Sequence, residues 1–101
     1  MTVAKVKDVP KGKMIQVQVN GKDILLANVD GTIYAIENIC SHAGGFLHEG
    51  CLDGSTVECP LHAAQFSVTT GKVSDDTPWA HDQPSYPVTI VGDDVCVEVS
   101  R

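Results

Sequence analysis

The stretches Cys40-Ser41-His42 and Cys59-Pro60-Leu61-His62 each pair one cysteine with one histidine, and we call them the first box and the second box. Each pair lies within about one turn of chain, so two such loops can deliver two thiolates and two imidazoles to a single buried metal centre. Thiolates suit zinc, Cu(I) and iron–sulfur clusters, while imidazole is accepted by zinc, copper and iron. The kinds of ligand alone therefore leave several metals open.

The order of the donors favours two irons over a single ion. A zinc finger usually presents both cysteines first and both histidines later, on a helix. Here each box carries one of each, as Cys-x-His and then Cys-x-x-His. In a Rieske centre two cysteines bind one iron and two histidines bind the other, which suits one cysteine and one histidine from each of two facing loops. The interleaved order therefore favours a [2Fe–2S] cluster, with a zinc site as the alternative.

The boxes and the turns around them resemble a known family. Cys40-Ser41-His42-Ala43-Gly44 and Cys59-Pro60-Leu61-His62 look like the two cluster-binding boxes of the Rieske family. Shorter stretches resemble the soluble Rieske-type ferredoxins in particular: Leu52-Asp53-Gly54, Phe66-Ser67-Val68, Thr70-Gly71-Lys72 and Tyr86-Pro87-Val88. The resemblance spans roughly residues 2 to 100. It implies one [2Fe–2S] cluster per chain with four ligands: Cys40, His42, Cys59 and His62.

Length and composition predict one small globular domain. A chain of 101 residues corresponds to a single domain, residues 1–101, which can bury a modest core but cannot also house a large catalytic domain. Hydrophobic residues make up 43% of the chain and charged residues 20%, as in ordinary globular proteins. The composition therefore argues against disorder.

Charge and hydropathy disfavour two classes of partner. Seven Lys and Arg against thirteen Asp and Glu give a formal net charge of −6, which works against binding nucleic acid. An acidic surface could steer the protein to a basic patch on a partner protein, with simple solubility as the alternative reason for it. No apolar run is long enough to cross a bilayer, and Met1–Lys5 lacks the apolar core of a signal peptide. We therefore expect a soluble, cytoplasmic protein that binds neither nucleic acid nor membrane.

Three strands are predicted before the first box, at Met14–Val19, Lys22–Val29 and Thr32–Glu37. In the first of these, Ile15, Val17 and Val19 share one face, which is the period-two pattern of a half-buried strand. Asn20-Gly21 is a strong two-residue hairpin signal because both positions tolerate positive φ, and Asp30-Gly31 is a second turn. The three strands should form a meander that leads into the first box.

Glycines and prolines mark the irregular parts of the remaining chain. Four glycines between the boxes, together with Val57 and Phe66–Val68, indicate a small cluster-binding β subdomain at approximately residues 38–70. Residues 74–87 contain three prolines, which lack the donor hydrogen that an interior strand requires. We expect a long surface excursion there.

The predicted fold class is all-β. The chain ends in two strands, Val88–Val91 and Val95–Val99, in which the odd-numbered valines of the second strand face inward and Cys96 lies on the opposite face. No convincing helix is present. The N-terminal hairpins and this C-terminal pair should pack as an antiparallel β-sandwich or small barrel with the cluster-binding subdomain inserted between them, and the resemblance implies the same Rieske-like architecture.

Two cysteines remain outside the boxes. Cys51 and Cys96 are interpreted as packing or surface residues, with a mutual disulfide as the alternative. Rieske proteins of cytochrome bc complexes have additional cysteines that tie the two loops together, at the positions of Gly44 and Leu61 here. The resemblance therefore implies that these loops are not disulfide-linked, which is consistent with a reducing compartment.

The other histidines and the single tryptophan are not predicted to be ligands. His48 and His81 have no spaced partner and are expected to be solvent-exposed loop residues. In the family a proline-containing loop covers the cluster. Pro78 and Trp79 are thus candidates for such a cover, with ordinary packing of an aromatic side chain as the alternative.

The resemblance also predicts a low reduction potential. High-potential relatives have a serine two residues after the second histidine and a tyrosine four residues after it, and both hydroxyls donate hydrogen bonds that stabilise the reduced cluster. The corresponding positions here are Ala64 and Phe66, which have no hydroxyl. We expect a potential nearer to that of dioxygenase ferredoxins than to that of respiratory proteins.

The residues outside the boxes give no sign of a catalytic site. A terminal oxygenase holds a mononuclear iron with two histidines and a carboxylate, whereas only His48 and His81 are left here. With the resemblance, this predicts an electron-transfer protein, not an enzyme, with no small-molecule substrate. It would carry one electron from a flavin-dependent NAD(P)H reductase to a terminal oxygenase. Two alternatives stay open: an accessory subunit resembling the small subunit of nitrite reductase, and a zinc-stabilised interaction module.

Overall fold

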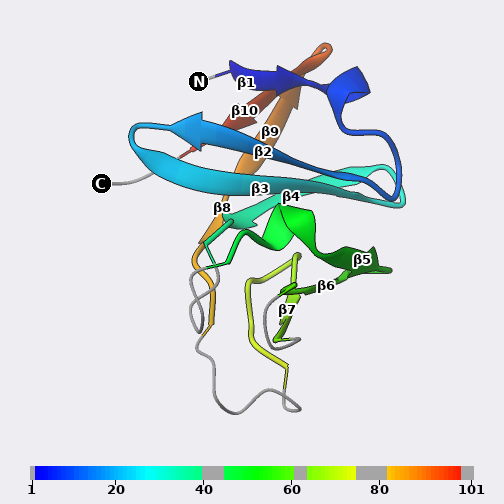
Figure 1. Ribbon diagram of the computed structural model, residues 1–101. Helices are drawn as coiled ribbons and strands as arrows, with labels where there is room; N and C mark the ends of the chain where they lie inside the picture. The colour runs from blue at the N-terminus through cyan, green and yellow to red at the C-terminus, as the bar shows by residue number, and fades with distance from the viewer. Residues whose placement is uncertain (1, 40–44, 61–63, 75–81, 99–101) are drawn as a thin grey trace.

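The computed structural model describes residues 2–39, 45–60, 64–74 and 82–98 (Figure 1). Within these ranges the strands are β1 (Thr2–Lys5), β2 (Met14–Val19), β3 (Lys22–Val29), β4 (Thr32–Glu37), β5 (Cys51–Asp53), β6 (Thr56–Glu58), β7 (Gln65–Ser67), β8 (Ser85–Tyr86), β9 (Val88–Val91) and β10 (Asp94–Val97). Two short 3-10 helices accompany them, η1 (Val6–Asp8) and η2 (Leu47–Glu49). No helix in the described part of the chain is long and apolar enough to cross a membrane.

The strands form three antiparallel sheets. The central sheet has the order β2-β3-β4-β8, the second has the order β1-β10-β9, and the third has the order β5-β6-β7. Figure 1 shows the sheet of β1, β9 and β10 at one end of the molecule and the sheet of β5–β7 at the other. The third sheet lies in the chain between β4 and β8, so it is inserted between two neighbouring strands of the central sheet. The predicted all-β fold is confirmed.

The meander of β2, β3 and β4 has the predicted bounds. Its two turns are two-residue connections, since Val19 pairs with Lys22 and Val29 pairs with Thr32. Both residues of each turn have positive φ, with 52° at Asn20 and 80° at Gly21 in the first. This backbone conformation matches the right-handed twist of the flanking strands. Asn-Gly and Asp-Gly predict such two-residue turns because both positions tolerate positive φ.

Strand β3 is buried on both faces and separates two cores. The four residues Ile24–Ala27 are all 0% exposed, so the strand reads as a continuous apolar run. Alternate side chains enter what we call the box-side core, made of Leu25, Ala27, Ile36, Leu47, Val57, Cys59, Ala64, Phe66 and Val68. The others enter the far core, made of Val9, Val19, Ile24, Leu26, Ile33, Ala35, Val95 and Val97. Truncating a buried leucine costs about 2–5 kcal/mol, so both cores depend on this strand.

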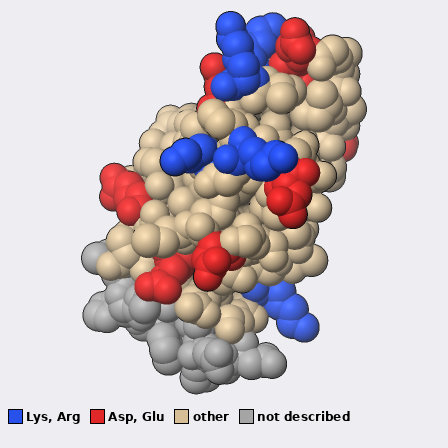
Figure 2. Space-filling view, turned by 90° about the vertical axis from the view of Figure 1, so that its right-hand side faces the viewer, with Lys and Arg blue, Asp and Glu red and all other residues tan. Residues whose placement is uncertain are grey.

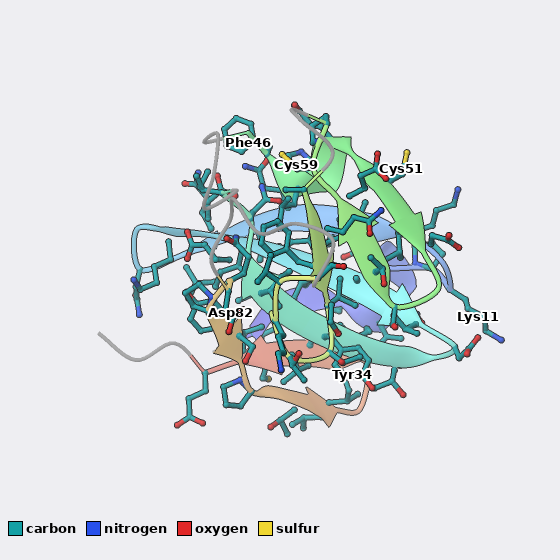
Figure 3. The ribbon with its side chains drawn as sticks, turned by 90° about the horizontal axis from the view of Figure 1, so that it is seen from below. Lys11, Tyr34, Phe46, Cys51, Cys59 and Asp82 are labelled. Carbon is teal, nitrogen blue, oxygen red and sulfur yellow. The ribbon has the colours of Figure 1, made fainter. Side chains whose placement is uncertain are left out.

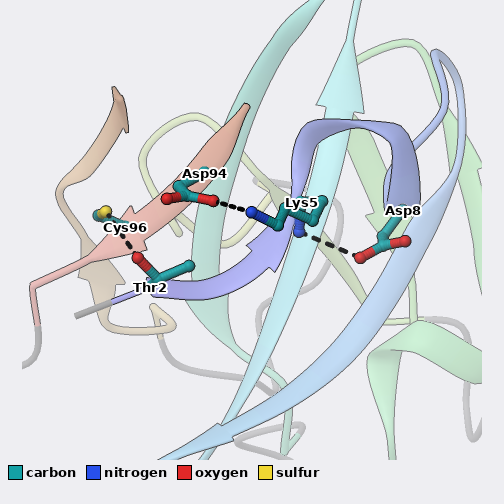
Figure 4. A network of polar contacts seen from close by, with 5 residues as sticks. All are labelled: Thr2, Lys5, Asp8, Asp94 and Cys96. Carbon is teal, nitrogen blue, oxygen red and sulfur yellow. Dashed lines mark hydrogen bonds and ion pairs between the residues drawn. The ribbon is translucent and has the colours of Figure 1, made fainter. Parts of the chain in front are cut away.

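The chain ends meet in the second sheet. The C-terminal hairpin is confirmed as β9 and β10, with Val95 and Val97 buried and Cys96 half-buried, while residue 99 lies outside the described residues. Strand β1 was not predicted and pairs with β10. Figure 4 shows the polar contacts between the two strands: the Lys5 ammonium pairs with the Asp94 carboxylate, and Thr2 Oγ1 lies 3.6 Å from Cys96 Sγ. Exposed side-chain contacts of this kind contribute little to stability. Strand β1 is therefore held mainly by its backbone hydrogen bonds to β10.

The second half of the surface excursion predicted at residues 74–87 is largely exposed, as expected, but it contains a buried glutamine and a short strand that were not predicted. Residues 75–81, with Pro78 and Trp79, lie outside the described residues. Beyond them Gln83 is 3% exposed, and β8 pairs with Ala35 and Ile36 of β4. A short strand between two prolines is possible here because β8 lies at the edge of its sheet, where only one side needs donor hydrogens.

Candidate metal centre

The second box is described at its first two residues. Cys59 follows β6 directly and is 1% exposed, within the box-side core. Its backbone N–H donates to the carbonyl of Ala64 over 2.7 Å, which continues the pairing of β6 with β7 beyond Glu58 and Gln65. The box is therefore a loop closed at its base by a backbone hydrogen bond, with a cysteine side chain directed into a dry interior.

A glycine makes room for this loop. A Cβ atom at Gly50 would lie 1.9 Å from the carbonyl oxygen of Glu58 and 3.1 Å from Cδ of Pro60. The backbone of Gly50 thus packs directly on the chain on either side of Cys59. Since no other residue lacks a Cβ, the close approach explains one of the glycines that the sequence places between the boxes.

The first box is closed at its base in a similar way. Ile39 and Phe46 form an antiparallel bridge, and the N–H of Leu47 donates to the carbonyl of Asn38 over 2.8 Å. Residues 40–44, with the predicted ligands Cys40 and His42, lie outside the described residues, as does His62 of the second box. What the structure describes of the first box is therefore its base.

A buried amide organises that base. Asn38 is 0% exposed; its Oδ1 accepts the backbone N–H of His48 over 2.9 Å, and its Nδ2 lies 2.9 Å from both Asp23 Oδ1 and His48 Nδ1. Asp23 in turn accepts two hydrogen bonds from Gln16 Nε2, at 2.8 and 2.7 Å. The prediction of an exposed His48 is wrong, because this residue is half-buried and hydrogen-bonded; His81 lies outside the described residues. The only sequence signal for Asn38 was a polar residue among the apolar ones that precede the first box.

The bases of the two boxes share one core. Leu47, next to the bridge of the first box, packs in the box-side core with Cys59 and Ala64. Figure 3 shows Phe46 and Cys59 on the same side of the molecule. The remaining cysteines are Cys51, exposed on β5, and Cys96, on β10; both have free thiols, so the alternative of a mutual disulfide is wrong.

Comparison with known proteins identifies this arrangement. Residues 1–87 match the family described as the Rieske [2Fe-2S] domain. The chain belongs to this family. Because the match includes both boxes and the strands around them, the resemblance inferred from the sequence is confirmed, and so is the prediction of a single [2Fe–2S] cluster as the cofactor of this Rieske protein.

Several individual relatives are similar over most of their length. The ferredoxin component of naphthalene 1,2-dioxygenase/salicylate 5-hydroxylase systems from Ralstonia sp. is 46% identical over 83 residues, which are 82% of this chain and 79% of the relative. The solved structure of Sphingomonas yanoikuyae B1 ferredoxin has a TM-score of 0.91 at 30% identity and covers 99% of this chain and 98% of its own. A chain in the complex of reduced oxygenase and oxidized ferredoxin in carbazole 1,9a-dioxygenase has a TM-score of 0.88 at 30% identity, covering 96% and 90%.

The residues of this Rieske protein fit such a cluster. The two boxes supply two thiols and two imidazoles, the donor set of a Rieske centre. The one predicted ligand that the structure describes, Cys59, is 1% exposed, and its backbone N–H is hydrogen-bonded to the carbonyl of Ala64. Among the described residues no group of three or more His, Cys, Asp and Glu side chains forms a rival metal site.

The described surroundings of Cys59 are apolar. Ala64 and Phe66, the positions at which high-potential relatives carry hydroxyls, are both 0% exposed in the same core as Cys59. Alanine and phenylalanine at these two positions offer no hydroxyl hydrogen bond that would stabilise the added negative charge of a reduced cluster. The expectation of a low potential stays a prediction, with this packing in its favour.

The surface beside the first box carries an exposed aromatic side chain. Phe46 is 38% exposed, and its ring centroid lies 5.9 Å from that of His48 with an interplanar angle of 58°. Figure 2 shows acidic and basic side chains interspersed on one face of the molecule, so the net charge of −6 is not gathered there into a single acidic patch. Phe46 is thus the distinctive feature at this end of the described surface.

Proposed function

We propose that this protein is the electron-transfer ferredoxin of a ring-hydroxylating dioxygenase system. It would accept single electrons from a flavin-dependent NAD(P)H reductase and pass them to a terminal oxygenase, and would not itself be an enzyme. The observation that carries the proposal is the near full-length likeness to proteins named as ferredoxin components of such systems, including a ferredoxin in complex with its oxygenase. We further propose that residues 1–101 act as one Rieske domain with a cluster-binding subdomain at approximately residues 38–70.

Four residues are proposed as the ligands: Cys40, His42, Cys59 and His62. The cluster, when bound, supplies a site that gains and loses one electron. The protein's own residues define the setting of that site. Leu47, Ala64 and Phe66 exclude water from the side of Cys59 that faces the core, and the hydrogen bond from Cys59 N–H to Ala64 fixes the base of the second box. A water-excluded, hydrogen-bonded base would help to hold the ligands in position, as the interactions around a metal site generally do.

Phe46 is proposed as an anchor for the oxygenase. Exposed aromatic side chains often contribute most of the binding energy at protein interfaces, and this one borders the first box. We also propose that the protein works in the cytoplasm, where thiols such as those of Cys51 and Cys96 stay reduced.

The proposal is tested first by the cofactor content of anaerobically purified protein. We expect two irons and two acid-labile sulfides per chain and a rhombic electron paramagnetic resonance signal after one-electron reduction. Cys59→Ala should abolish the signal, whereas Cys51→Ala, at an exposed position, should leave it unchanged. A colourless protein with one zinc and no sulfide would refute the proposal.

The second test is electron delivery to a partner. We expect the reduced protein to reduce a ring-hydroxylating terminal oxygenase in a stopped-flow mixture, and Phe46→Ala to slow this about 5- to 30-fold, the factor for a loss of about 1–2 kcal/mol of interface energy. Val91→Ala is the matched control, since Val91 is 60% exposed on β9 in the other sheet. Equal rates for Phe46→Ala and wild type would show that Phe46 is not part of the interface with the oxygenase.

A further inference from the structure

A buried glutamine lies at the base of the first box. The Gln83 side chain donates from Nε2 to two backbone carbonyls, that of Glu37 at 2.8 Å and that of Ile39 at 2.7 Å. Gln83 is 3% exposed, so these hydrogen bonds do not compete with bulk water. Ile39 directly precedes Cys40. One amide group therefore holds the backbone of the segment that enters the first box.

The reason for a glutamine here is the proline that follows it. The pairing of Ala35 with Tyr86 and of Ile36 with Ser85 puts Glu37 opposite Pro84, and the N–H of Glu37 donates to the Pro84 carbonyl over 2.8 Å. An antiparallel ladder would return a hydrogen bond from residue 84 to Glu37, but proline has no N–H. The Gln83 side chain supplies the missing donor and reaches one step further, to Ile39.

The backbone of the same residue contacts the chain that leaves the second box. Gln83 N–H donates to the carbonyl of Gly71 over 2.6 Å, and Gly71 N–H donates to the carbonyl of Ser67, at the end of β7, over 2.7 Å. A Cβ at Gly71 would lie 2.0 Å from the Gln83 carbonyl oxygen, and Gly71 has a φ of +79°. Only glycine allows this contact. Gln83 thus joins the chain before the first box to the chain after the second.

We propose that Gln83 is a positioning residue that fixes the first box relative to the second and thereby holds the two ligand pairs in register. The proposal rests on the proposed function, since it takes Cys40 and His42 as ligands of the cluster. Two hydrogen bonds from one planar amide set both the position and the direction of the backbone at Glu37 and Ile39. Without them the described segment that enters the first box, residues 37–39, would lose two of the hydrogen bonds that hold it and could separate locally while the rest of the fold persists.

The test first removes the side-chain amide of Gln83 and then restores a donor for the Glu37 carbonyl by a second substitution. Gln83→Met keeps a side chain of similar length without a donor, and we expect an iron chelator to remove the iron about 10- to 30-fold faster, the effect of two lost hydrogen bonds on a local opening. The reduced cluster should also show a broadened or shifted rhombic resonance signal. Pro84→Ala in the Gln83→Met background restores an N–H opposite Glu37 and should recover a substantial part of the retention. This rescue distinguishes positioning from general stability, because losing a proline alone tends to destabilise the fold.

Asn28 provides a matched control. It is also a buried amide, 6% exposed, and its Nδ2 donates to the carbonyl of Val9 over 2.7 Å. It lies near the C-terminal end of β3 and not at the base of the first box. Asn28→Leu should lower the thermal midpoint without changing the resonance signal or the rate of iron loss at a temperature where the fold is intact. The inference is overturned if Gln83→Met keeps the wild-type signal and rate, or if Pro84→Ala gives no recovery. Failure of the proposed function is a different result, since wild-type protein would then contain no iron and sulfide.

Discussion

Asn38 binds His48 twice, at the backbone and at the ring. Its Oδ1 accepts the His48 N–H over 2.9 Å, and its Nδ2 lies 2.9 Å from His48 Nδ1. The orientation of the Asn38 amide is fixed, because the reverse orientation would put its Nδ2 against the His48 N–H and its Oδ1 against the Asp23 carboxylate. Nδ1 of His48 must therefore be the acceptor, and the base of the first box contains a histidine with one defined tautomer.

The tautomer of His48 is the first prediction. With Nδ1 accepting from Asn38, the ring proton of the neutral imidazole should reside on Nε2. Nitrogen chemical shifts of labelled protein in the pH range where this ring is neutral should show a protonated Nε2 and an unprotonated Nδ1. Asn38→Leu, which removes the donor, should bring the ring closer to the tautomer mixture of free histidine. A proton found on Nδ1 in the wild type would contradict the hydrogen-bond network.

The second prediction concerns the reduction potential. Ala64→Ser and Phe66→Tyr each introduce a hydroxyl in the core that contains Cys59, and we expect each to raise the midpoint potential. A net hydrogen bond of about 0.5–1.5 kcal/mol corresponds to about 20–65 mV for one electron. Ala35→Ser is the control, because Ala35 is 2% exposed but belongs to the far core. Redox titrations in which Ala64→Ser and Ala35→Ser shift the potential equally would show that the effect is not local to the box.

Local pattern and tertiary context explain what the sequence predicted and what it did not. Strands β2 to β4 were predicted to the residue because alternation and primed turns are local signals. Strand β1 was missed since its four residues, Thr2–Lys5, become a strand only by pairing with β10, far along the chain. The roles of Asn38 and Gln83 were missed for the same reason: a polar residue's burial depends on partners that the fold brings to it.

The two boxes, in contrast, could be recognised from the sequence alone. Their spacing, with one cysteine and one histidine in each, is enough to indicate the family, because metal chemistry restricts which residue types can occur together. His48 shows the limit of that argument. Because it has no spaced partner, the sequence predicts a solvated residue, whereas the fold uses it to hold the base of the first box.

The third prediction tests the packing on the second box. In Gly50→Ala the new Cβ would lie 1.9 Å from the Glu58 carbonyl oxygen, so the backbone beside Cys59 has to move. We expect a loss of about 1–3 kcal/mol or more in unfolding free energy, the range for overpacking, together with weaker cluster retention. Gly54→Asn is the control, since a Cβ at Gly54 would have nothing within 4 Å and asparagine tolerates the φ of +61° at this position. Equal denaturant midpoints for the two variants would show that this close approach is not needed.

The fourth prediction is a pH dependence at the junction of β4 and β8. Tyr86 donates its hydroxyl to Glu37 Oε1 over 2.9 Å, and burial, this hydrogen bond and the carboxylate charge raise the pKa of Tyr86 from 10.0 to about 12. Because the folded-state pKa lies above the ordinary value, the stabilisation is complete below about pH 10 and is lost as the pH rises through about 12. Unfolding free energies of the wild type should thus fall more steeply than those of Tyr86→Phe between these pH values. Glu37→Gln, which keeps an acceptor but removes the charge, should give an intermediate slope, and parallel curves for wild type and Tyr86→Phe would rule out a shifted tyrosine.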